Sequence, residues 1–149
     1  MNYINKKLKI EKVDVKNIAK KYNTPTYCYS YKQLKNNIDK FKKSFKSFSP
    51  LICFSVKSNN NLNLIKEIKK FGLGADVVSM GELMMAIKAG INPKKIIFSG
   101  VGKTSNEISY AIDKKIFLIN AESKSEIMEI NRIAKLKRKK IQIGIRLNP

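Results

Sequence analysis

A lysine ends an apolar segment in the stretch CFSVKSNNN, residues 53–61. If this segment is a strand, alternation places Cys53, Ser55 and Lys57 on one face, which is small and polar. At the partly dehydrated mouth of a barrel, a lysine amine favours its neutral form and becomes a nucleophile towards aldehydes. Spacing alone favours a less reactive lysine, which lies along apolar surface or pairs with an acid. Both interpretations of Lys57 stay open at this point.

Polar side chains follow four more apolar segments. In chain order they are Asp76 with Ser79 and Glu82; Ser99, Gly100, Gly102, Lys103 and Thr104; Asn120 with Glu122; and Arg146 with Asn148. Because parallel strands present their carboxyl ends at one edge, five polar endings predict a lined pocket mouth. Asp76 and Glu82 are candidate charge partners for Lys57, although Glu82 would equally suit the first turn of a helix. Arg146 is expected to form a structural ion pair or to clamp an anionic ligand.

The elements that must position these residues alternate strictly. Strands are expected at residues 51–57, 74–79, 95–100, 116–120 and 141–149, and helices at 61–72, 80–90, 105–115 and 122–140. Such alternation with continuously apolar strands is typical of a parallel sheet covered by helices, either doubly wound or closed into a barrel. No GxGxxG follows a strand, which removes the main support for a dinucleotide-binding unit. GVGKT at residues 100–104 lacks the first glycine of a P-loop.

The N-terminal third does not follow this alternation. A short helix is expected after Val13 and before Pro25, then a strand in the aromatic stretch TYCYSY, residues 26–31. Ser30 is expected to cap a long amphipathic helix that Pro50 ends. At the other end, RLNP closes an apolar strand with no helix after it. Because an uncovered parallel sheet is costly, we expect the chain to be the N-terminal fragment of a longer protein.

Composition limits the classes of partner. The chain has 31 Lys and Arg against 11 Asp and Glu, a net charge of +20, which would suit a nucleic acid. The basic residues are scattered along the chain, which favours a solvated surface, so we expect no nucleic-acid partner and keep one as a remote alternative. There is no histidine, and the two cysteines lack metal-ligand spacing, so no metal is expected. Neither a signal peptide nor a membrane span is recognisable, which predicts a cytoplasmic protein.

Several segments together resemble one family. Val-Lys-x-Asn at 56–59 and Gly-x-Gly-x-Asp-x-x-Ser-x-Gly-Glu-Leu at 72–83 are similar to the cofactor-lysine region of the pyridoxal-phosphate (PLP) decarboxylases of the alanine-racemase-like barrel class. Within this class the chain most resembles the diaminopimelate decarboxylases, through NTPTYCYS at 23–30, KIIFSGVGKTSNEISYAI at 95–112 and IGIRLNP at 143–149. Asn23 stands where that family usually has glycine.

The resemblance implies a fold and a reaction. Residues 29–149 would be the first part of a PLP-binding (β/α)8 barrel of the TIM type, with about five parallel strands. Residues 1–28 would be a helix and strand segment that packs with a C-terminal β domain. The implied enzyme is a PLP-dependent carboxy-lyase, a homodimer that converts meso-diaminopimelate to L-lysine in the last step of lysine biosynthesis. PLP would supply an electron sink, and the protein would supply positioning and electrostatics.

It also implies residue roles and leaves alternatives. Lys57 matches the lysine that binds PLP as a Schiff base, and Asp76 and Arg146 match residues near the cofactor. The family's ring-stacking histidine and its phosphate-binding glycine loop lie later in the chain, so these 149 residues alone are expected to bind PLP poorly and to be inactive. Another PLP barrel enzyme, a decarboxylase of ornithine, arginine or carboxynorspermidine or an amino-acid racemase, is the nearest alternative. A non-catalytic PLP-binding protein is another.

Overall fold

The computed structural model describes residues 2–147, which form two compact units divided between Ser49 and Pro50. Each unit is described by itself. Asn148, one of the polar residues expected to end the fifth strand, lies outside the described residues. No helix within residues 2–147 is long and apolar enough to cross a membrane.

The first unit begins with a small antiparallel sheet that the sequence did not predict. Strands β1 (Asn2–Ile4) and β2 (Lys7–Ile10) form a hairpin, and β3 (Val13–Asp14) pairs with the other edge of β2. The turn residues Asn5 and Lys6 have φ angles of 50° and 60°. Two-residue hairpin turns require such positive φ angles, and asparagine tolerates them well, so Asn5 was the available signal.

Two helices follow, as the sequence predicts. Asp14 caps α1 (Val15–Tyr22) by accepting a hydrogen bond from the backbone N–H of Lys16. Ser30 caps α2 (Tyr31–Ser44), as predicted, by accepting one from the backbone N–H of Gln33. Helix α2 ends before Pro50, and a turn of 3-10 helix, η1 (Lys46–Phe48), follows it.

The prediction of a strand at residues 26–31 was wrong. Residues 26–30 have no regular secondary structure, and Tyr27 and Tyr29 are 90% and 65% exposed. Alternating aromatic residues favour a strand only when a neighbouring strand pairs with them, and no strand of the described chain does so here. Tyr31, the last residue of the stretch, begins α2 instead.

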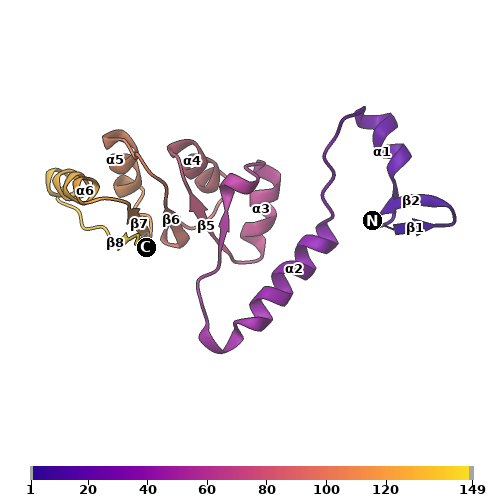
Figure 1. The fold of residues 1–149 in the computed structure, drawn as a ribbon, viewed down its shortest axis with the longest axis horizontal. Coiled ribbons are helices and arrows are strands. Elements are labelled where there is room, and N and C mark those ends of the chain that lie inside the picture. The colour runs from indigo at the N-terminus through magenta and orange to yellow at the C-terminus, as the bar shows by residue number, and fades with distance from the viewer. Residues whose placement is uncertain (1, 148–149) are drawn as a thin grey trace. The chain divides into compact units, whose positions relative to one another are not determined.

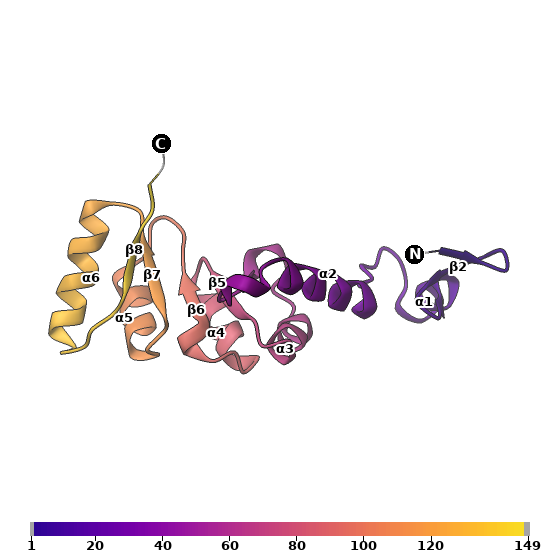
Figure 2. The ribbon, with the colours of Figure 1, turned by 90° about the horizontal axis from the view of Figure 1, so that it is seen from below.

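The second unit is a five-stranded parallel sheet, as predicted (Figures 1 and 2). Its strands lie in chain order: β4 (Cys53–Ser55), β5 (Gly74–Val77), β6 (Ile96–Phe98), β7 (Leu118–Ala121) and β8 (Ile143–Ile145). The connections contain α3 (Leu62–Lys70), α4 (Met80–Lys88), α5 (Ser105–Asp113) and α6 (Lys124–Leu136), with the 3-10 turn η3 (Pro93–Lys95) before β6.

The two faces of this sheet differ sharply. One face packs against the helices through side chains that are almost completely buried: Ala75, Val77, Ile96, Phe98, Ile119 and Ala121 from the strands, with Leu83, Ala86, Ile108, Ala111, Ile112 and Ile130 from the helices. The opposite face carries Cys53, Ser55, Asp76 and Asn120, which are only partly buried. Figure 1 shows α4, α5 and α6 on the same side of the sheet. A doubly wound sheet has helices on both faces, so this unit has the arrangement of a barrel wall.

Candidate active site at the carboxyl ends of the strands

Lys57 follows β4, but it is not part of that strand. The strand ends at Ser55, and Lys57 lies in a turn of 3-10 helix, η2 (Val56–Ser58). The hydroxyl of Ser58 donates a 2.7 Å hydrogen bond to the carbonyl of Ser55, and the N–H of Asn59 donates to the carbonyl of Val56. These bonds turn the chain two residues before the predicted strand end. Lys57 is exposed, and its amine has no hydrogen bond or ion pair within residues 2–147.

Asp76 lies on the neighbouring strand. The register of β4 and β5 pairs Asp76 with Ser55, which precedes Lys57 by two residues, so both predicted site residues are at adjacent strand ends. Oδ1 of Asp76 accepts a 2.6 Å hydrogen bond from the hydroxyl of Ser99, at the end of β6. Cys53 lies on the same face of β4. Burial, and then the negative charge of Asp76, raise the pKa of the Cys53 thiol to about 11.

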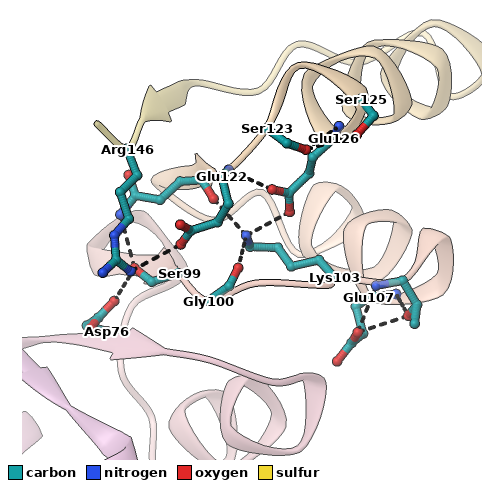
Figure 3. A network of polar contacts seen from close by, with 12 residues as sticks. Asp76, Ser99, Gly100, Lys103, Glu107, Glu122, Ser123, Ser125, Glu126 and Arg146 are labelled. Atoms are coloured by element: carbon teal, nitrogen blue, oxygen red, sulfur yellow. Dashed lines mark hydrogen bonds and ion pairs between the residues drawn. The ribbon is translucent and has the colours of Figure 1, made fainter. Parts of the chain in front are cut away.

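The hydrogen bonds continue from Ser99 to β7. Nδ2 of Asn120 donates a 3.0 Å hydrogen bond to the hydroxyl oxygen of Ser99. Asn120, Ser99 and Asp76 therefore form a chain across the ends of three neighbouring strands, and Figure 3 shows Ser99 beside Asp76. Sequence reasoning placed Ser99 and Asn120 at strand ends but gave them no role. The signal was their position on adjacent strands, which depends on the register.

Lys103, from the GVGKT stretch, uses its ammonium group for contacts within the protein. Its side chain is 1% exposed, and Nζ donates to the carbonyls of Gly100 and Asn120 at 2.6 and 2.7 Å. It also forms a 2.8 Å ion pair with Oε1 of Glu126, whose side chain is 9% exposed (Figure 3). All three protons of this ammonium thus have an acceptor. This lysine joins the ends of β6 and β7 to the start of α6.

Glu82 serves the start of its own helix. One of its carboxylate oxygens, Oε2, accepts a hydrogen bond from the backbone N–H of Val78, while its own N–H donates to the hydroxyl of Ser79. These two hydrogen bonds satisfy backbone donors at and just before the N-terminus of α4. Of the two sequence interpretations of Glu82, the structure therefore supports the helix-start role, and Glu82 makes no ion pair with Lys57 within the described chain.

Glu107 also binds backbone donors at a helix start, but it does so for two helices. It forms a capping box with Thr104 at the start of α5, and its Oε1 accepts a 3.0 Å hydrogen bond from the backbone N–H of Met80 in α4. The hydrogen bond from the Thr104 backbone, together with that from Met80, lowers the pKa of this carboxyl below its usual range. Glu107 therefore fixes the starts of two neighbouring helices relative to each other.

Arg146 follows β8 and forms an ion pair. Its Nη1 lies 3.3 Å from Oε1 of Glu122, and its backbone N–H donates to the carbonyl of Ala121. The guanidinium-bearing side chain is 57% exposed, whereas that of Glu122 is 14% exposed. Within residues 2–147 no hydrogen bond joins Arg146 to Asp76 or Lys57. The exposed guanidinium keeps further N–H donors available for an anion.

The strand ends thus present groups of complementary chemistry. Lys57 offers an amine without a partner in the described chain, Asp76 has a second carboxylate oxygen that accepts no bond there, and Arg146 offers a partly used cation. An amine can bind an aldehyde covalently, and a guanidinium binds phosphate or carboxylate. The residues therefore fit an anionic aldehyde such as PLP. The described residues contain no cluster of three metal-ligating side chains.

Comparisons with known proteins agree with this geometry. Residues 31–149 match the family model described as pyridoxal-dependent decarboxylase, pyridoxal binding domain. The diaminopimelate decarboxylase of Aquifex aeolicus is 42% identical over all 149 residues, which span 35% of that protein. The crystal structure of diaminopimelate decarboxylase from Helicobacter pylori, complexed with L-lysine, matches 91% of the chain with a TM-score of 0.88 and 38% identity; the match covers 34% of that structure.

A relative with a different named substrate is less similar. The arginine decarboxylase of Paramecium bursaria Chlorella virus matches 80% of the chain with a TM-score of 0.71 and 27% identity, over 33% of its own length. The chain therefore spans about a third of the proteins that it matches, and it shares their barrel fold over that part. Because the family model covers most of its residues, the chain belongs to the pyridoxal-dependent decarboxylases.

Proposed function

We propose that this chain forms the N-terminal part of a PLP-dependent carboxy-lyase that converts meso-diaminopimelate to L-lysine and carbon dioxide. One observation carries the proposal. At the carboxyl edge of a family-matched barrel wall, Lys57, an exposed lysine without a partner in the described chain, follows Ser55 by two residues, and Ser55 pairs with Asp76 on the neighbouring strand. The proposed protein uses this edge as half of its active site, and the rest of the barrel supplies the other half.

Lys57 is the residue proposed to bind PLP covalently. An amine that already held an ion pair would have to break it before it could attack an aldehyde, and Lys57 has none to break within residues 2–147. When bound, PLP supplies an electron sink for the electron pair that carbon dioxide leaves behind. Its position in the 3-10 turn directly after β4 supports this role, because strand ends are where barrel enzymes carry their reactive groups.

Asp76 and Arg146 are proposed to hold charge around that amine. Asp76 lies on the adjacent strand, where its free carboxylate oxygen can attract an ammonium or accept a proton from a cofactor or substrate group. Arg146 uses Nη1 for Glu122 and keeps its other donors for an anionic group of the cofactor or substrate. Glu122 limits where that guanidinium can point.

The choice of substrate rests on similarity. The Aquifex aeolicus relative is named for diaminopimelate and is 42% identical, against 27% for the viral arginine decarboxylase. The Helicobacter pylori structure contains L-lysine, which is the product of the proposed reaction. These findings support meso-diaminopimelate over arginine, and they also support an amino-acid substrate more generally.

Assembly, domain division and location are part of the same proposal. The protein is proposed to be a cytoplasmic homodimer in which residues 29–149 begin the PLP-binding barrel. Residues 1–28 are proposed to pack with a β domain beyond residue 149. Exposed aromatic side chains in and beside that segment, Tyr22, Tyr27 and Tyr29, support this packing, because exposed apolar surface marks contact sites.

A chimera tests the proposal without requiring the rest of this protein. The corresponding third of the Aquifex aeolicus enzyme is replaced by this chain, and carbon dioxide release is measured with meso-diaminopimelate, L-arginine and L-ornithine. We expect release from meso-diaminopimelate alone. Borohydride reduction after PLP addition, followed by peptide mapping, should place the cofactor on Lys57.

Each outcome decides a different part of the proposal. Labelling at Lys57 with turnover of arginine or ornithine instead would contradict the substrate. Labelling without turnover of any of the three would support a non-catalytic PLP-binding protein. Labelling spread evenly over many lysines, with no activity, would contradict the role of Lys57.

A further inference from the structure

Ser99 lies between two polar side chains, and the direction of its hydrogen bonds is determined by its neighbours. A serine hydroxyl has one proton to donate and can accept from others. Nδ2 of Asn120, which can only donate, lies 3.0 Å from the Ser99 oxygen. The carboxylate of Asp76, which can only accept when ionised, lies 2.6 Å away. Asn120 therefore donates to Ser99, and the single Ser99 proton points to Asp76.

The distance to Asp76 agrees with this direction. A hydroxyl that donates to a carboxylate typically lies about 2.5–2.7 Å from it, because the charge strengthens the bond. Ser99 thereby occupies Oδ1 and restricts the rotation of the carboxylate. Oδ2 keeps its acceptor sites for a group outside residues 2–147.

Two glycines allow the conformation in which Asn120 and Ser99 form this hydrogen-bond chain. A Cβ atom at Gly144, on β8, would overlap Oδ1 of Asn120, so the absence of a side chain there leaves room for the amide in its present orientation. Gly100, directly after Ser99, has a φ of +96°, a conformation that side chains rarely adopt. A Cβ there would also lie 3.3 Å from Cβ of Val78, which is a tight contact. The turn after Ser99 thus depends on glycine.

Lys103 holds the main chain at both donors of the hydrogen-bond chain. It binds the carbonyl of Asn120 itself and that of Gly100, the residue after Ser99. Its ion pair with Glu126 is buried, and Oε2 of Glu126 accepts from the backbone N–H of Glu122. The ends of β6 and β7 are therefore held at a constant separation, which the 3.0 Å bond between Asn120 and Ser99 requires.

We propose that Ser99 and Asn120 are positioning residues for Asp76, acting through a hydrogen-bond chain with a fixed direction. Lys103 maintains that chain by holding the two strand ends together. This inference rests on the proposed function, in which Asp76 faces the cofactor or substrate. It extends that function by assigning three residues that act through Asp76 and do not contact the reacting atoms.

The first test needs neither cofactor nor activity. In the full 149-residue chain, NMR signals of the Asn120 side-chain amide report its hydrogen bond to Ser99. We expect slow proton exchange in the unmodified chain, exchange at least about 10-fold faster in Ser99→Ala, and recovery in Ser99→Thr, which keeps the hydroxyl. Lys88→Met is the matched control, because Lys88 is exposed on α4. Equal exchange in Ser99→Ala and Lys88→Met would overturn the proposal.

The second test measures the consequence for the reaction in the chimera. A misplaced carboxylate should lower kcat, by about 10-fold in Ser99→Ala and in Asn120→Asp, with KM for meso-diaminopimelate changed less than about 2-fold. Ser99→Thr, which keeps the hydroxyl, should restore kcat. Unchanged kcat in both variants of an active chimera would overturn the inference.

The two tests separate this inference from the function on which it rests. An unmodified chimera without decarboxylase activity would contradict the proposed function, while the amide exchange would still decide whether the hydrogen-bond chain exists. If Lys103→Met does not fold, the Ser99 and Asn120 variants decide alone. If it folds, its Asn120 amide should exchange faster than in Lys88→Met, and equal exchange would exclude Lys103 from the arrangement.

Discussion

The ends of β4 and β6 each carry a lysine, and the two lysines are in opposite situations. Lys57 is exposed, with no partner in the described chain. Lys103 is 1% exposed, and its three protons go to Gly100, Asn120 and Glu126. Both follow short apolar strands, and both belong to stretches that sequence reasoning considered for chemistry.

The two lysines differ in their number of partners: Lys103 has three, and Lys57, which we propose to be the reactive one, has none in the described chain. Bringing an ammonium out of water costs several kcal/mol, which Lys103 offsets with three acceptors, one of them the carboxylate of Glu126. If the ammonium of Lys103 left these acceptors while still buried, it would lose the contacts that offset this cost. Lys57, the residue that we propose to bind PLP, has no such contacts to break within the described chain.

The largest expected effect concerns the β4 end. Lys57→Ala in the chimera should abolish both borohydride-fixed PLP and decarboxylation, because it removes the amine proposed to bind the cofactor. The free energy of unfolding should change by no more than about 0.5 kcal/mol, since the side chain is exposed. Peptide mapping and urea unfolding measure the two quantities. If PLP still labelled another lysine of the Lys57→Ala chimera and full activity remained, the contrast drawn between Lys57 and Lys103 would be wrong.

The β6 end should behave in the opposite way. Lys103→Met leaves the carboxylate of Glu126 buried and unpaired, which should cost about 3–5 kcal/mol of unfolding free energy. In the double variant Lys103→Met/Glu126→Gln, the charge is gone and an acceptor for the N–H of Glu122 remains, so part of that loss should return. Urea unfolding checks both variants. A single variant as stable as Lys57→Ala would show that burial does not distinguish the two lysines.

Sequence periodicity predicted most of the second unit, because its helices and strands bury one continuous face. Ile108, Ala111 and Ile112 recur at helical spacing, and all three are buried in α5. Lys57 was predicted at the tip of a strand, but the hydrogen bond from Ser58 to Ser55 ends β4 earlier. Such a local side-chain bond competes with the strand, and hydrophobic pattern does not reveal it.

The candidate site was only partly predictable for a related reason. Each strand end could be located, and the resemblance singled out Lys57, Asp76 and Arg146. The bonds between strand ends depend on the register, which sets Ser99 beside Asp76 and Asn120 beside Ser99. Likewise, the three acceptors of Lys103 come from segments up to 23 residues away in sequence. Spacing in sequence carries no information about such contacts.

A smaller effect measures the electrostatic environment around the β4 end. The pKa of the Cys53 thiol is raised to about 11 by burial first and by Asp76 second, while Lys95 lowers it. Asp76→Asn removes a nearby negative charge, so the thiolate becomes less unfavourable and the pKa should fall. Lys95→Met should raise it. Iodoacetamide alkylation against pH, in a Cys28→Ser background, measures both. Shifts of the same sign in the two variants would contradict this account.

The smallest effect belongs to two partly buried lysines that pair with an exposed carboxylate. Lys137 and Lys139 each lie 2.6 Å from an oxygen of Asp113, whose side chain is 44% exposed. Their hydrogen bonds, that of Lys137 foremost, lower the pKa of the Asp113 carboxyl from 3.8 to about 2. A carboxyl with a lowered pKa stabilises the fold above its unfolded pKa, and this contribution disappears as the pH falls through the folded pKa.

Asp113→Asn should therefore reduce stability slightly at neutral pH, and the difference from the unmodified chain should shrink between pH 3.8 and about 2. Added salt should also shrink it at neutral pH, because exposed pairs are screened. Urea unfolding across pH and salt concentration measures both trends. A loss of unfolding free energy as large as that of Lys103→Met, or a difference insensitive to salt, would mean that an ion pair makes a lysine structural even without burial. A small difference in unfolding free energy that salt screens would instead show that burial makes Lys103 structural. Exposed lysines such as Lys57 would then remain available for chemistry.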